Sequence, residues 1–388
     1  MISGWILAAG IGIGAYALLM VLYRHHFQQL RPFLPLPVSR NPVISFSVLI
    51  PARNESASIA DCIRSVFNNA YPSYLYEVIV IDDHSEDDTA QQVMGLQKEY
   101  AGLQLIRLSD YSKDETSTLY KKRALELGIR ESKGDWIVTT DADALVPGNW
   151  LSLLNSYIQE HDPMMIAAPV IFHSGKSILS IFQQLDFMTM QGITAASVAS
   201  GMHSMCNGAN LAYRKEIFYA VGGFAGNEHL ATGDDMLLMH KVKRAYPEKI
   251  GYLFSKESIV TTRPQESWKA FFQQRIRWAS KADSYDEPII FGVLLGVWLL
   301  NTLLLLGIPA VFFYRSLLFP WLALMAIKTI AELYFLFPVA AFFERKKLLI
   351  YFPFLQPLHL VYMVIAGWLG KFGNYEWKNR VIVTSSKP

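Results

Sequence analysis

Cysteine is scarce in this chain of 388 residues, which contains only Cys62 and Cys206. A disulfide framework is therefore not expected, and a reducing compartment suits the main domain. The Gly-rich phosphate loops of the GxGxxG and Walker types are missing as well. The charge of any bound phosphate therefore has to be met by a metal ion and by basic side chains.

Charge of one sign is not concentrated in any segment. The formal net charge is +2, and the sequence has no basic patch of the kind that binds nucleic acid. The histidines lack the mutual spacing of zinc ligands and are interpreted as ordinary loop residues; they include His84, His173, His203 and His229. We therefore expect neither a nucleic-acid partner nor a zinc site.

Apolar residues are present in excess. Hydrophobic residues make up 52% of the chain, and its mean hydropathy is +0.22, which is too apolar for an ordinary soluble enzyme. Residues 4–23 carry no charge, and Arg24, His25 and His26 follow them directly. A cleaved signal peptide usually has its basic residues before the apolar run. Residues 1–24 are therefore predicted to form a membrane anchor after which the chain enters the cytoplasm.

Apolar runs return in the C-terminal region 288–371. Residues 288–313 and 317–343 each reach membrane length, and a basic loop follows them. A hairpin with this loop in the cytoplasm agrees with a cytosolic catalytic domain. Lys328 and Glu332 have the spacing of an ion pair on one helical face. Such a pair either lines a path for a lipid substrate or neutralises two charges at a helix contact.

The last apolar run, residues 348–370, contains Pro353 and Pro357. Proline can kink a span or mark a re-entrant or interfacial hairpin, and both alternatives stay open. A full crossing would place the basic tail 372–388 outside, against the positive-inside rule. The sequence thus predicts three spans and a further segment that either spans or re-enters.

Strand and helix patterns alternate between residues 45 and 170. Strands are predicted at 46–50, 78–81, 103–108 and 136–139, with helices at 59–67, 89–99, 121–131 and 150–158. This alternation predicts a parallel sheet covered by helices on both faces. Ser58 and Asp61 are placed to form a capping box for the first of these helices.

Polar clusters stand at three of the predicted strand ends: Pro51-Ala52-Arg53-Asn54-Glu55, Asp82-Asp83 and Asp141-Ala142-Asp143. Ligands of such sheets bind beyond the carboxyl ends of the strands, so the three clusters are predicted to share one cleft. The first acidic pair could also consist of turn and cap residues, and the second could be a chance recurrence in a loop. In the functional interpretation, carboxylates at a strand end hold a hard divalent cation that keeps positions for substrate phosphates.

Two further clusters follow. Asp234-Asp235 stands where a loop enters a helix, either as an N-terminal acid cap or as a general base aimed at an acceptor hydroxyl. Gln274-Arg275-Ile276-Arg277-Trp278 belongs to an aromatic helix near 265–282, which is predicted to be amphipathic and interfacial and is suited to hold a diphosphate and stack on a sugar. Residues 176–190 form either an interfacial helix beside an acceptor or part of a packed core.

The whole ordered set resembles the membrane-bound, inverting nucleotide-sugar glycosyltransferases of family two, which include cellulose and hyaluronan synthases and ceramide glucosyltransferases. The resemblance runs from about Ser45 to Trp278. It implies an α/β domain at 45–282 with the GT-A fold, which is Rossmann-like with a mostly parallel sheet. It also implies a multi-pass protein of the inner membrane with N- and C-terminal transmembrane helices and a cytoplasmic catalytic domain. His84 and Glu126 depart from the residues common in the family, which blurs donor specificity.

The resemblance also implies roles for single residues. The donor-binding residues would be Pro51, Arg53, Asn54, Glu55, Asp82, Asp83, Lys121 and Asp141. Asp143, with Asp141, would bind Mg²⁺ or Mn²⁺, and Asp235, beside Asp234, would be the catalytic base. The Gln-x-x-Arg-Trp motif, typical of processive synthases and ceramide-type enzymes, places Gln274, Arg275, Arg277 and Trp278 at the diphosphate and acceptor. Asn207 and Gly208 would begin an acceptor-side segment.

Taken together, the motifs predict a metal-dependent transfer of a sugar from a nucleotide-sugar donor, with a UDP-sugar favoured, to a membrane lipid or lipid-linked glycan. The small number of spans favours a single transfer, whereas the Gln-x-x-Arg-Trp motif favours a processive polysaccharide synthase. A non-catalytic nucleotide-binding membrane subunit is expected to have lost an essential carboxylate, and none is lost here. Nucleotidyl transfer would need a basic phosphate-binding loop early in the chain, which residues 51–55 do not provide.

Overall fold

The computed structural model describes residues 2–34, 41–111, 120–203, 205–225, 233–281, 287–377 and 380–383. The chain divides into two compact units, each built from separate stretches of sequence. We call them the sheet unit, Arg31–His173 with Ser204–Arg263, and the helical unit, Met1–Leu30 with Ser174–His203 and Pro264–Pro388. The segment 45–282 that resembles a glycosyltransferase domain therefore contributes to both units.

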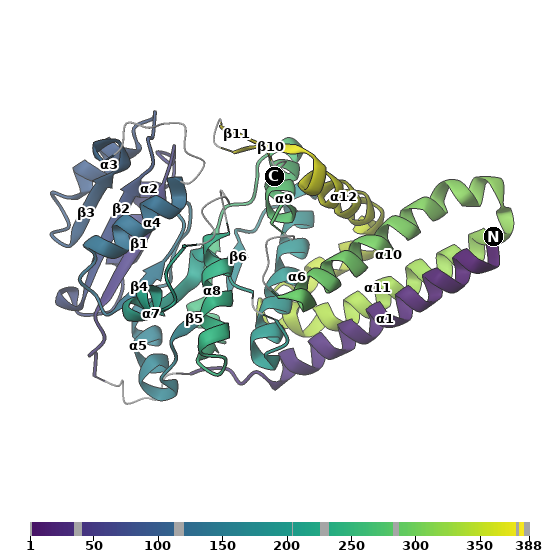
Figure 1. Ribbon diagram of the computed structural model, residues 1–388, viewed down its shortest axis with the longest axis horizontal. Helices are drawn as coiled ribbons and strands as arrows, with labels where there is room; N and C mark the ends of the chain where they lie inside the picture. Colours follow the sequence, from purple (N-terminus) through teal and green to yellow (C-terminus); the bar gives the residue numbers. More distant parts are fainter. Residues whose placement is uncertain are drawn as a thin grey trace. The chain divides into compact units, whose positions relative to one another are not determined.

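A seven-stranded mixed sheet forms the core of the sheet unit (Figure 1). In spatial order its strands are β3 (Leu103–Arg107), β2 (Tyr76–Asp82), β1 (Phe46–Ala52), β4 (Trp136–Thr139), β7 (Leu211–Arg214), β5 (Met165–Ala167) and β8 (Ile250–Tyr252). The first four are mutually parallel, β5 is parallel to β8, and β7 is antiparallel to both of its neighbours. A separate parallel pair joins β6 (Val170–Phe172) to β9 (Val260–Thr262). The predicted α/β fold with a mostly parallel sheet is confirmed.

Helices connect and cover these strands. They are α2 (Ile59–Phe67), α3 (Thr89–Leu96), α4 (Tyr120–Glu131), α5 (Trp150–His161), α7 (Lys215–Ala220) and α8 (Asp234–Ala245), with 3₁₀ turns η1 (Ser73–Leu75), η2 (Leu108–Asp110), η3 (Gly208–Asn210) and η4 (Lys256–Ser258). The apolar face of α2 is buried as its spacing predicts. The predicted capping box at its start is wrong: the Ser58 hydroxyl donates to the Glu55 carboxylate at 3.1 Å and accepts no backbone N–H of α2. Glu55 is within reach because the preceding turn brings it beside Ser58.

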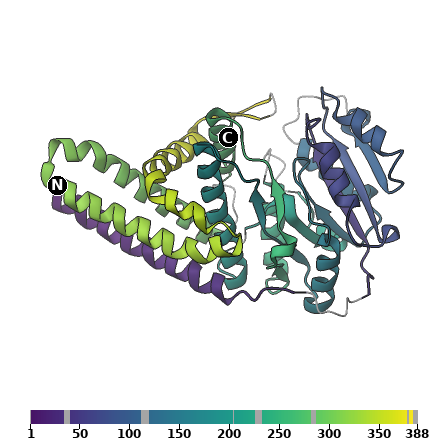
Figure 2. The ribbon, with the colours of Figure 1, turned by 180° about the vertical axis from the view of Figure 1, so that it is seen from behind.

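The helical unit contains α1 (Ile2–Gln29), α6 (Ile178–Ser200), α9 (Trp268–Ala279), α10 (Pro288–Phe313), η6 (Arg315–Leu317), α11 (Leu318–Phe342), η7 (Lys346–Tyr351), α12 (Phe352–Phe372) and the hairpin β10 (Asn374–Trp377) with β11 (Arg380–Val383). Within the described residues, four helical segments are long and apolar enough to cross a membrane: Gly4–Gln29, Pro288–Phe313, Arg315–Phe342 and Lys346–Phe372. The apolar runs predicted from the sequence thus form helices. Figures 1 and 2 show α1 lying along α11.

The two charged residues inside α11 form the predicted ion pair. Lys328 Nζ lies 2.6 Å from Glu332 Oε1, and both side chains are buried. Gln356 of α12 completes the cluster, because its amide oxygen accepts from Lys328 and its amide nitrogen donates to Glu332. Neutralisation at a helix contact therefore accounts for these charges, since both are enclosed among helices.

The course of α12 is unusual for a spanning helix. Gln356, near its start, already lies beside the middle of α11, and Leu360 packs in a cluster with Leu300 and Leu304 of α10. From there α12 runs back along α10, where Trp298 Nε1 donates to the carbonyl of Val364 at 3.2 Å. At Gly370 the backbone meets the end of α9 so closely that an added Cβ would lie 2.7 Å from the Cβ of Ala279.

These successive contacts show in which direction α12 runs relative to the other helices of the helical unit. α1 runs antiparallel to α10, since Trp5 faces Gly307 and Gly12 faces Leu300, and it ends with Phe27 beside Phe342 at the end of α11. After α11 the chain therefore turns back between the helices to Gln356, and α12 then runs toward the start of α10. Figure 1 likewise shows α12 beside α9 and away from the N-terminal end of α1.

Candidate active site

The first polar segment, after β1, is tied to the loop after β2. Arg53 Nη1 donates to the carbonyls of Asp83 at 2.8 Å and His84 at 3.0 Å. The side-chain oxygen of Asn54 accepts a hydrogen bond from the backbone N–H of Glu86 at 2.8 Å. Asn54 and His84 adopt left-handed backbone conformations, with φ of 50° and 53°, in which the chain can make these close contacts. The strand ends thus meet, as their positions in a parallel sheet predict.

Asp82 and Asp83 are both 4% exposed. Asp83 Oδ1 lies 3.0 Å from His84 Nδ1 and 4.0 Å from Arg53 Nη1. Asp82 Oδ1 is buried and accepts no hydrogen bond from the residues that the structure describes. Because a buried acceptor without a donor is costly, this oxygen is a suitable partner for a donor group of a ligand.

Asp141 and Asp143 follow β4 and are partly buried. Asp143 Oδ1 accepts from the Thr262 hydroxyl at 3.1 Å, and the Asp141 carbonyl accepts from Cys62 Sγ at 3.4 Å. Burial raises the pKa of the Cys62 thiol, and the negative charges of Asp143, Asp141 and Glu55 raise it further. The negative charges of three carboxylates therefore reach the same buried side chain, Cys62.

This concentration of negative charge fits a divalent cation. Across the described ranges, no group of three His, Cys, Asp or Glu side chains is arranged to hold a metal. Asp141 and Asp143 nevertheless offer carboxylate oxygens, the donor type that Mg²⁺ and Mn²⁺ prefer. Such ions commonly complete their shells with water and substrate phosphates, so two carboxylates are a sufficient protein contribution.

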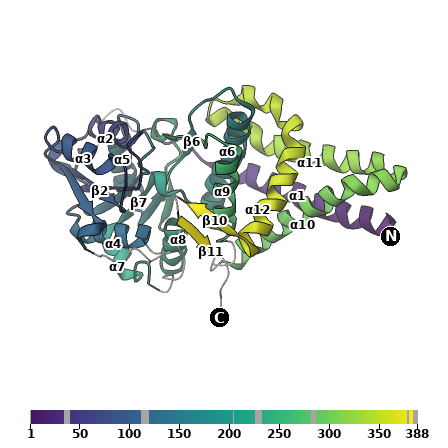
Figure 3. The same ribbon diagram turned by 90° about the horizontal axis from the view of Figure 1, so that it is seen from above.

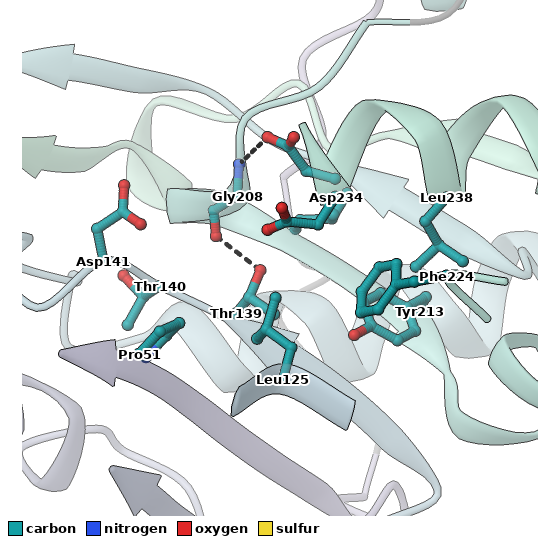
Figure 4. Close-up of a pocket in the computed structure, with 12 residues that line it drawn as sticks. Pro51, Leu125, Thr139, Thr140, Asp141, Gly208, Tyr213, Phe224, Asp234 and Leu238 are labelled. Atoms are coloured by element: carbon teal, nitrogen blue, oxygen red, sulfur yellow. Dashed lines mark hydrogen bonds between the residues drawn. The ribbon is translucent and has the colours of Figure 1, made fainter. Parts of the chain in front are cut away.

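Asp235, in the first turn of α8, is oriented by backbone N–H groups. Its Oδ2 accepts from the N–H of Gly208 and its Oδ1 from the N–H of Met236, each at 2.9 Å. Thr139 anchors the same loop by donating to the Gly208 carbonyl at 2.6 Å (Figure 4). Asp234 beside it is only 2% exposed. A loop, a strand end and a helix start thus fix the Asp235 carboxylate.

One pocket of the sheet unit collects residues from several of these segments (Figure 4). Its polar lining comes from the end of β4 and the turn after it, from η3 and from the start of α8, whereas Pro51 of β1 and aromatic and aliphatic side chains close it. The lining residues are Pro51, Leu125, Thr139, Thr140, Asp141, Gly208, Leu211, Tyr213, Phe224, Asp234, Asp235 and Leu238. Asp141 and Asp235, which are far apart in sequence, therefore line the same pocket.

The remaining predicted site residues lie elsewhere. Asn207 caps η3, since its side-chain oxygen accepts from the N–H of Ala209 at 2.9 Å. Lys121 belongs to the first turn of α4, and its side chain is outside the described part. Gln274, Arg275, Arg277 and Trp278 are on α9 in the helical unit. Arg275 is only 3% exposed and paired with Asp186, whereas the other three are partly exposed.

Sequence reasoning did not single out Thr139 or Thr262, which hold Gly208 and Asp143. Thr262 follows Asp143 by 119 positions, and no spacing rule connects residues so far apart. For Thr139, its place at the end of a buried strand directly before the acidic turn was an available signal.

Comparison with known proteins agrees with this geometry. Residues 42–281 match the family model described as glycosyltransferase like family 2. A probable glycosyltransferase, YdaM, of Bacillus subtilis is 27% identical over 241 residues, which cover 60% of this chain and 54% of that protein. A beta-monoglucosyldiacylglycerol synthase of Trichormus variabilis is 27% identical over 271 residues, covering 69% of this chain and 53% of that protein. The chain thus spans about half the length of these two relatives.

A solved structure extends the likeness to the fold. A mannosyltransferase from Pyrobaculum calidifontis, in complex with GDP-Man and Mn²⁺, superposes with a TM-score of 0.63 at 19% identity, covering 96% of this chain and 100% of that one. At this level of identity the likeness concerns the fold.

Proposed function

Because the chain belongs to the family-two glycosyltransferases with the GT-A fold, we propose that it transfers a sugar from a nucleotide-sugar donor to a hydroxyl group of a membrane lipid or lipid-linked glycan. The observation that carries this proposal is the pocket that Asp141 and Asp235 line together. One carboxylate belongs to the predicted metal turn and the other is the predicted base. A UDP-sugar is the favoured donor.

The donor's nucleoside is proposed to bind at the ends of β1 and β2. The buried Asp82 Oδ1, which accepts no hydrogen bond from the described part of the chain, offers an acceptor for an N–H group of a base. The segment from Pro51 to Glu55, together with Asp83, forms the surrounding wall. Lys121 contributes positive charge at the diphosphate in this proposal.

Asp143 and Asp141 would hold Mg²⁺ or Mn²⁺. When bound, such an ion offsets the negative charge that grows on the diphosphate leaving group. The proposal is supported by the carboxylate donor set, whose oxygens are the ligands that these ions prefer. It agrees with the presence of Mn²⁺ in the complex of the Pyrobaculum mannosyltransferase.

Asp235 would act as the general base. It takes the proton of the acceptor hydroxyl while that oxygen forms a bond to the anomeric carbon, and the bond from this carbon to the diphosphate oxygen breaks. A single displacement inverts the anomeric configuration. Its two backbone hydrogen bonds aim the carboxylate without neutralising it. General-base assistance of this kind typically contributes about 10²–10⁴ in rate.

The motif helix α9 adds roles that rest on the Gln-x-x-Arg-Trp pattern. Arg277 is proposed to offset leaving-group charge, Trp278 to stack on a sugar and Gln274 to bind the acceptor side. The same pattern supports processive synthesis as the alternative function.

A lipid-directed acceptor is supported by the four apolar helices and by the names of two relatives. One is the beta-monoglucosyldiacylglycerol synthase. The other is a dolichyl N-acetyl-alpha-D-glucosaminyl phosphate 3-beta-D-2,3-diacetamido-2,3-dideoxy-beta-D-glucuronosyltransferase of Methanococcus voltae, 23% identical over 322 residues that cover 76% of this chain and 92% of that protein. We propose an inner-membrane location with the sheet unit in the cytoplasm, since Arg24 and the basic residues 345–347 follow α1 and α11 at the same end of the helical unit.

The test incubates detergent-solubilised protein and Mg²⁺ or Mn²⁺ with a panel of UDP- and GDP-sugars, and follows nucleoside diphosphate release with and without membrane lipid extract. We expect release from one donor that the extract enhances and that Asp143→Ala abolishes, whereas Asp110→Ala, at an exposed acid, retains it. A growing high-mass product without enhancement would favour a polymer synthase. If folded protein releases no nucleoside diphosphate from any donor of the panel, a nucleotide-binding subunit would be favoured.

A further inference from the structure

A buried polar network joins three helices of the helical unit, α6, α9 and α12, which lie side by side in Figure 3. Asp186 Oδ2, on α6, accepts a hydrogen bond from Arg275 Nε of α9 at 2.8 Å and lies 2.7 Å from Nη2 of the same guanidinium as an ion pair. Its Oδ1 accepts from the hydroxyl of Tyr362 on α12. The side chains of Arg275 and Asp186 are 3% and 5% exposed. Each helix therefore supplies one member of a network that water hardly reaches.

Arg275 stands in the middle of the Gln-x-x-Arg-Trp segment. Its guanidinium carbon lies 4.3 Å from the ring centre of Trp278 and 4.7 Å from that of Phe271. Its Nη1 also donates to the Gln274 side chain. Arg275 thus contacts two motif residues and an anionic partner on another helix. A cation enclosed in this way is poorly placed to meet a diphosphate.

We propose that Asp186 and Tyr362 are positioning residues, which act through Arg275 to set the orientation of α9 and of the Gln274, Arg277 and Trp278 that it carries. The Arg275 Nε–H donates to the carboxylate in a charge-assisted hydrogen bond, and Nη2 makes an ion-pair contact with the same oxygen. Because the network is buried, these interactions are strong and resist displacement of any of the three helices. The expected effect on sugar transfer rests on the proposed function, whereas the expected effect on the orientation of α9 does not.

The contact with α12 extends this control to the membrane helices. Gln356, on the same helix as Tyr362, is bonded to Lys328 at 3.1 Å and to Glu332 at 2.6 Å on α11. α12 is therefore attached at one point to α11 and at another to the network that holds α9.

A chemically matched network provides the control. Tyr16 donates to Glu332 at 2.7 Å, and the same carboxylate is paired with Lys328 at 2.6 Å. It repeats the combination of tyrosine, carboxylate and cation, and Gln356 of α12 joins it, but none of these residues lies on α9. Tyr16→Phe therefore removes the same kind of hydrogen bond as Tyr362→Phe without removing a contact to α9.

The first experiment measures position and needs no turnover. Spin labels at Ala199→Cys on α6 and Lys269→Cys on α9, in full-length protein with Cys62→Ser and Cys206→Ser, report the distance between the two helices by double electron–electron resonance. We expect the distribution to broaden or shift in Asp186→Asn and Tyr362→Phe and to stay unchanged in Tyr16→Phe. Unchanged distributions in both network variants would overturn the proposal.

The second experiment measures kinetics. Asp186→Asn and Tyr362→Phe are expected to lower kcat about tenfold or more, because small misplacements of a reacting geometry are costly. Donor KM and nucleoside diphosphate affinity should stay close to wild type, and so should the melting temperature of Tyr362→Phe. Asp186→Asn leaves the buried Arg275 cation without its anion and is expected to melt at a lower temperature. Arg275→Lys, which keeps the charge and loses the planar fork, should resemble Asp186→Asn.

A joint loss of kcat, nucleotide affinity and melting temperature in the mild variant Tyr362→Phe would indicate a purely structural role and overturn the proposal. A wild-type protein that transfers no sugar, while its label distances respond as expected, would contradict the proposed function and leave the positioning role supported.

Discussion

At the residue scale, Asp235 is held by two backbone N–H groups, and its carboxylate is the proposed proton acceptor. Asp235→Asn keeps the size of the side chain but removes its ability to take a proton. We expect turnover to fall about 10²–10⁴-fold, with the Kd of the nucleoside diphosphate little changed. Product assays and isothermal titration calorimetry measure the two quantities, with Asp110→Asn as the surface control. Ordinary turnover in Asp235→Asn would remove this residue from the role of base.

Asp87 stabilises the loops around the proposed nucleoside site in a pH-dependent way. Burial raises its pKa, but hydrogen bonds from Thr89 and Ser56 outweigh this effect and lower the pKa to about 2 from the ordinary 3.8. A carboxyl whose pKa is lower in the folded state stabilises fully above about pH 4, and this stabilisation is lost as the pH falls toward 2.

Asp87→Asn should therefore reduce the free energy of unfolding at pH 7, by about 1 kcal/mol or less because water competes for a partly exposed group. Urea unfolding of both proteins between pH 7 and pH 3 is the measurement. We expect the difference to narrow below pH 4, and Asp88→Asn, at an exposed neighbour, to show little difference at any pH. A gap that persists unchanged at low pH would contradict this explanation.

The acidic turns could be predicted because each directly follows a buried strand. Their supporting partners could not, because Thr262 reaches Asp143 only through the pairing of β9 with β6 and the bridge of its neighbour Thr261 to Leu145. The burial of Arg275 was likewise hidden, since Asp186 precedes it by 89 positions. The metal and base roles of Asp143 and Asp235 stay predictions that the proposed assays test.

At the scale of elements, the returning course of α12 makes a topological prediction. If η7 and α12 re-enter, Lys347 and Lys371 lie on one side of the membrane and Arg315 lies on the other. Single cysteines at these exposed positions, in a background with Cys62→Ser and Cys206→Ser, can be labelled with an impermeant maleimide in oriented vesicles. We expect positions 347 and 371 to react from the same side. Reaction of position 371 together with position 315 would instead indicate a full crossing.

Element types were easier to predict than their environments. The strand at 136–139 was predicted with the bounds that β4 has, because a short apolar run before an acidic turn is an unambiguous pattern. In contrast, the segment 176–190 extends to Ser200 as α6, and its polar residues are buried. Gln183 bonds with the backbone of Gln265, and Asp186 with Arg275. An interfacial amphipathic helix and a buried helix with paired polar residues show the same sequence pattern. They can be told apart only when the partners of the polar residues are known.

At the scale of the whole molecule, metal and nucleotide binding should be interdependent, because Asp141 and Asp143 would supply only part of a coordination shell in the proposed metal site. We expect UDP with Mn²⁺ to raise the melting temperature more than either alone. A ligand at 100 times its Kd stabilises by about 2.7 kcal/mol. Thermal melts with and without EDTA measure the effect, and Asp143→Ala should lose it while Asp110→Ala keeps it. A full shift with Mn²⁺ alone would instead indicate a complete metal site in the protein.

The division into two units could not be predicted from the sequence. Hydropathy separates the apolar C-terminal helices from the rest, but α6 and α9 are not apolar enough to be assigned to them. The structure places both helices with α1, α11 and α12 because their polar residues find partners there. Membership of a unit therefore depends on contacts between distant segments, which a linear pattern does not contain.

The interrupted path of the chain also has a consequence for biogenesis. The polypeptide leaves the sheet unit after His173, forms α6 and returns at Ser204. On the ribosome, α6 is therefore complete before Arg275 and Tyr362 have been translated. Until then Asp186 is a charge without its native partners, which is costly to bury. Insertion of this protein thus has to keep α6 hydrated, or shielded by an insertion factor, until the C-terminal helices have been made.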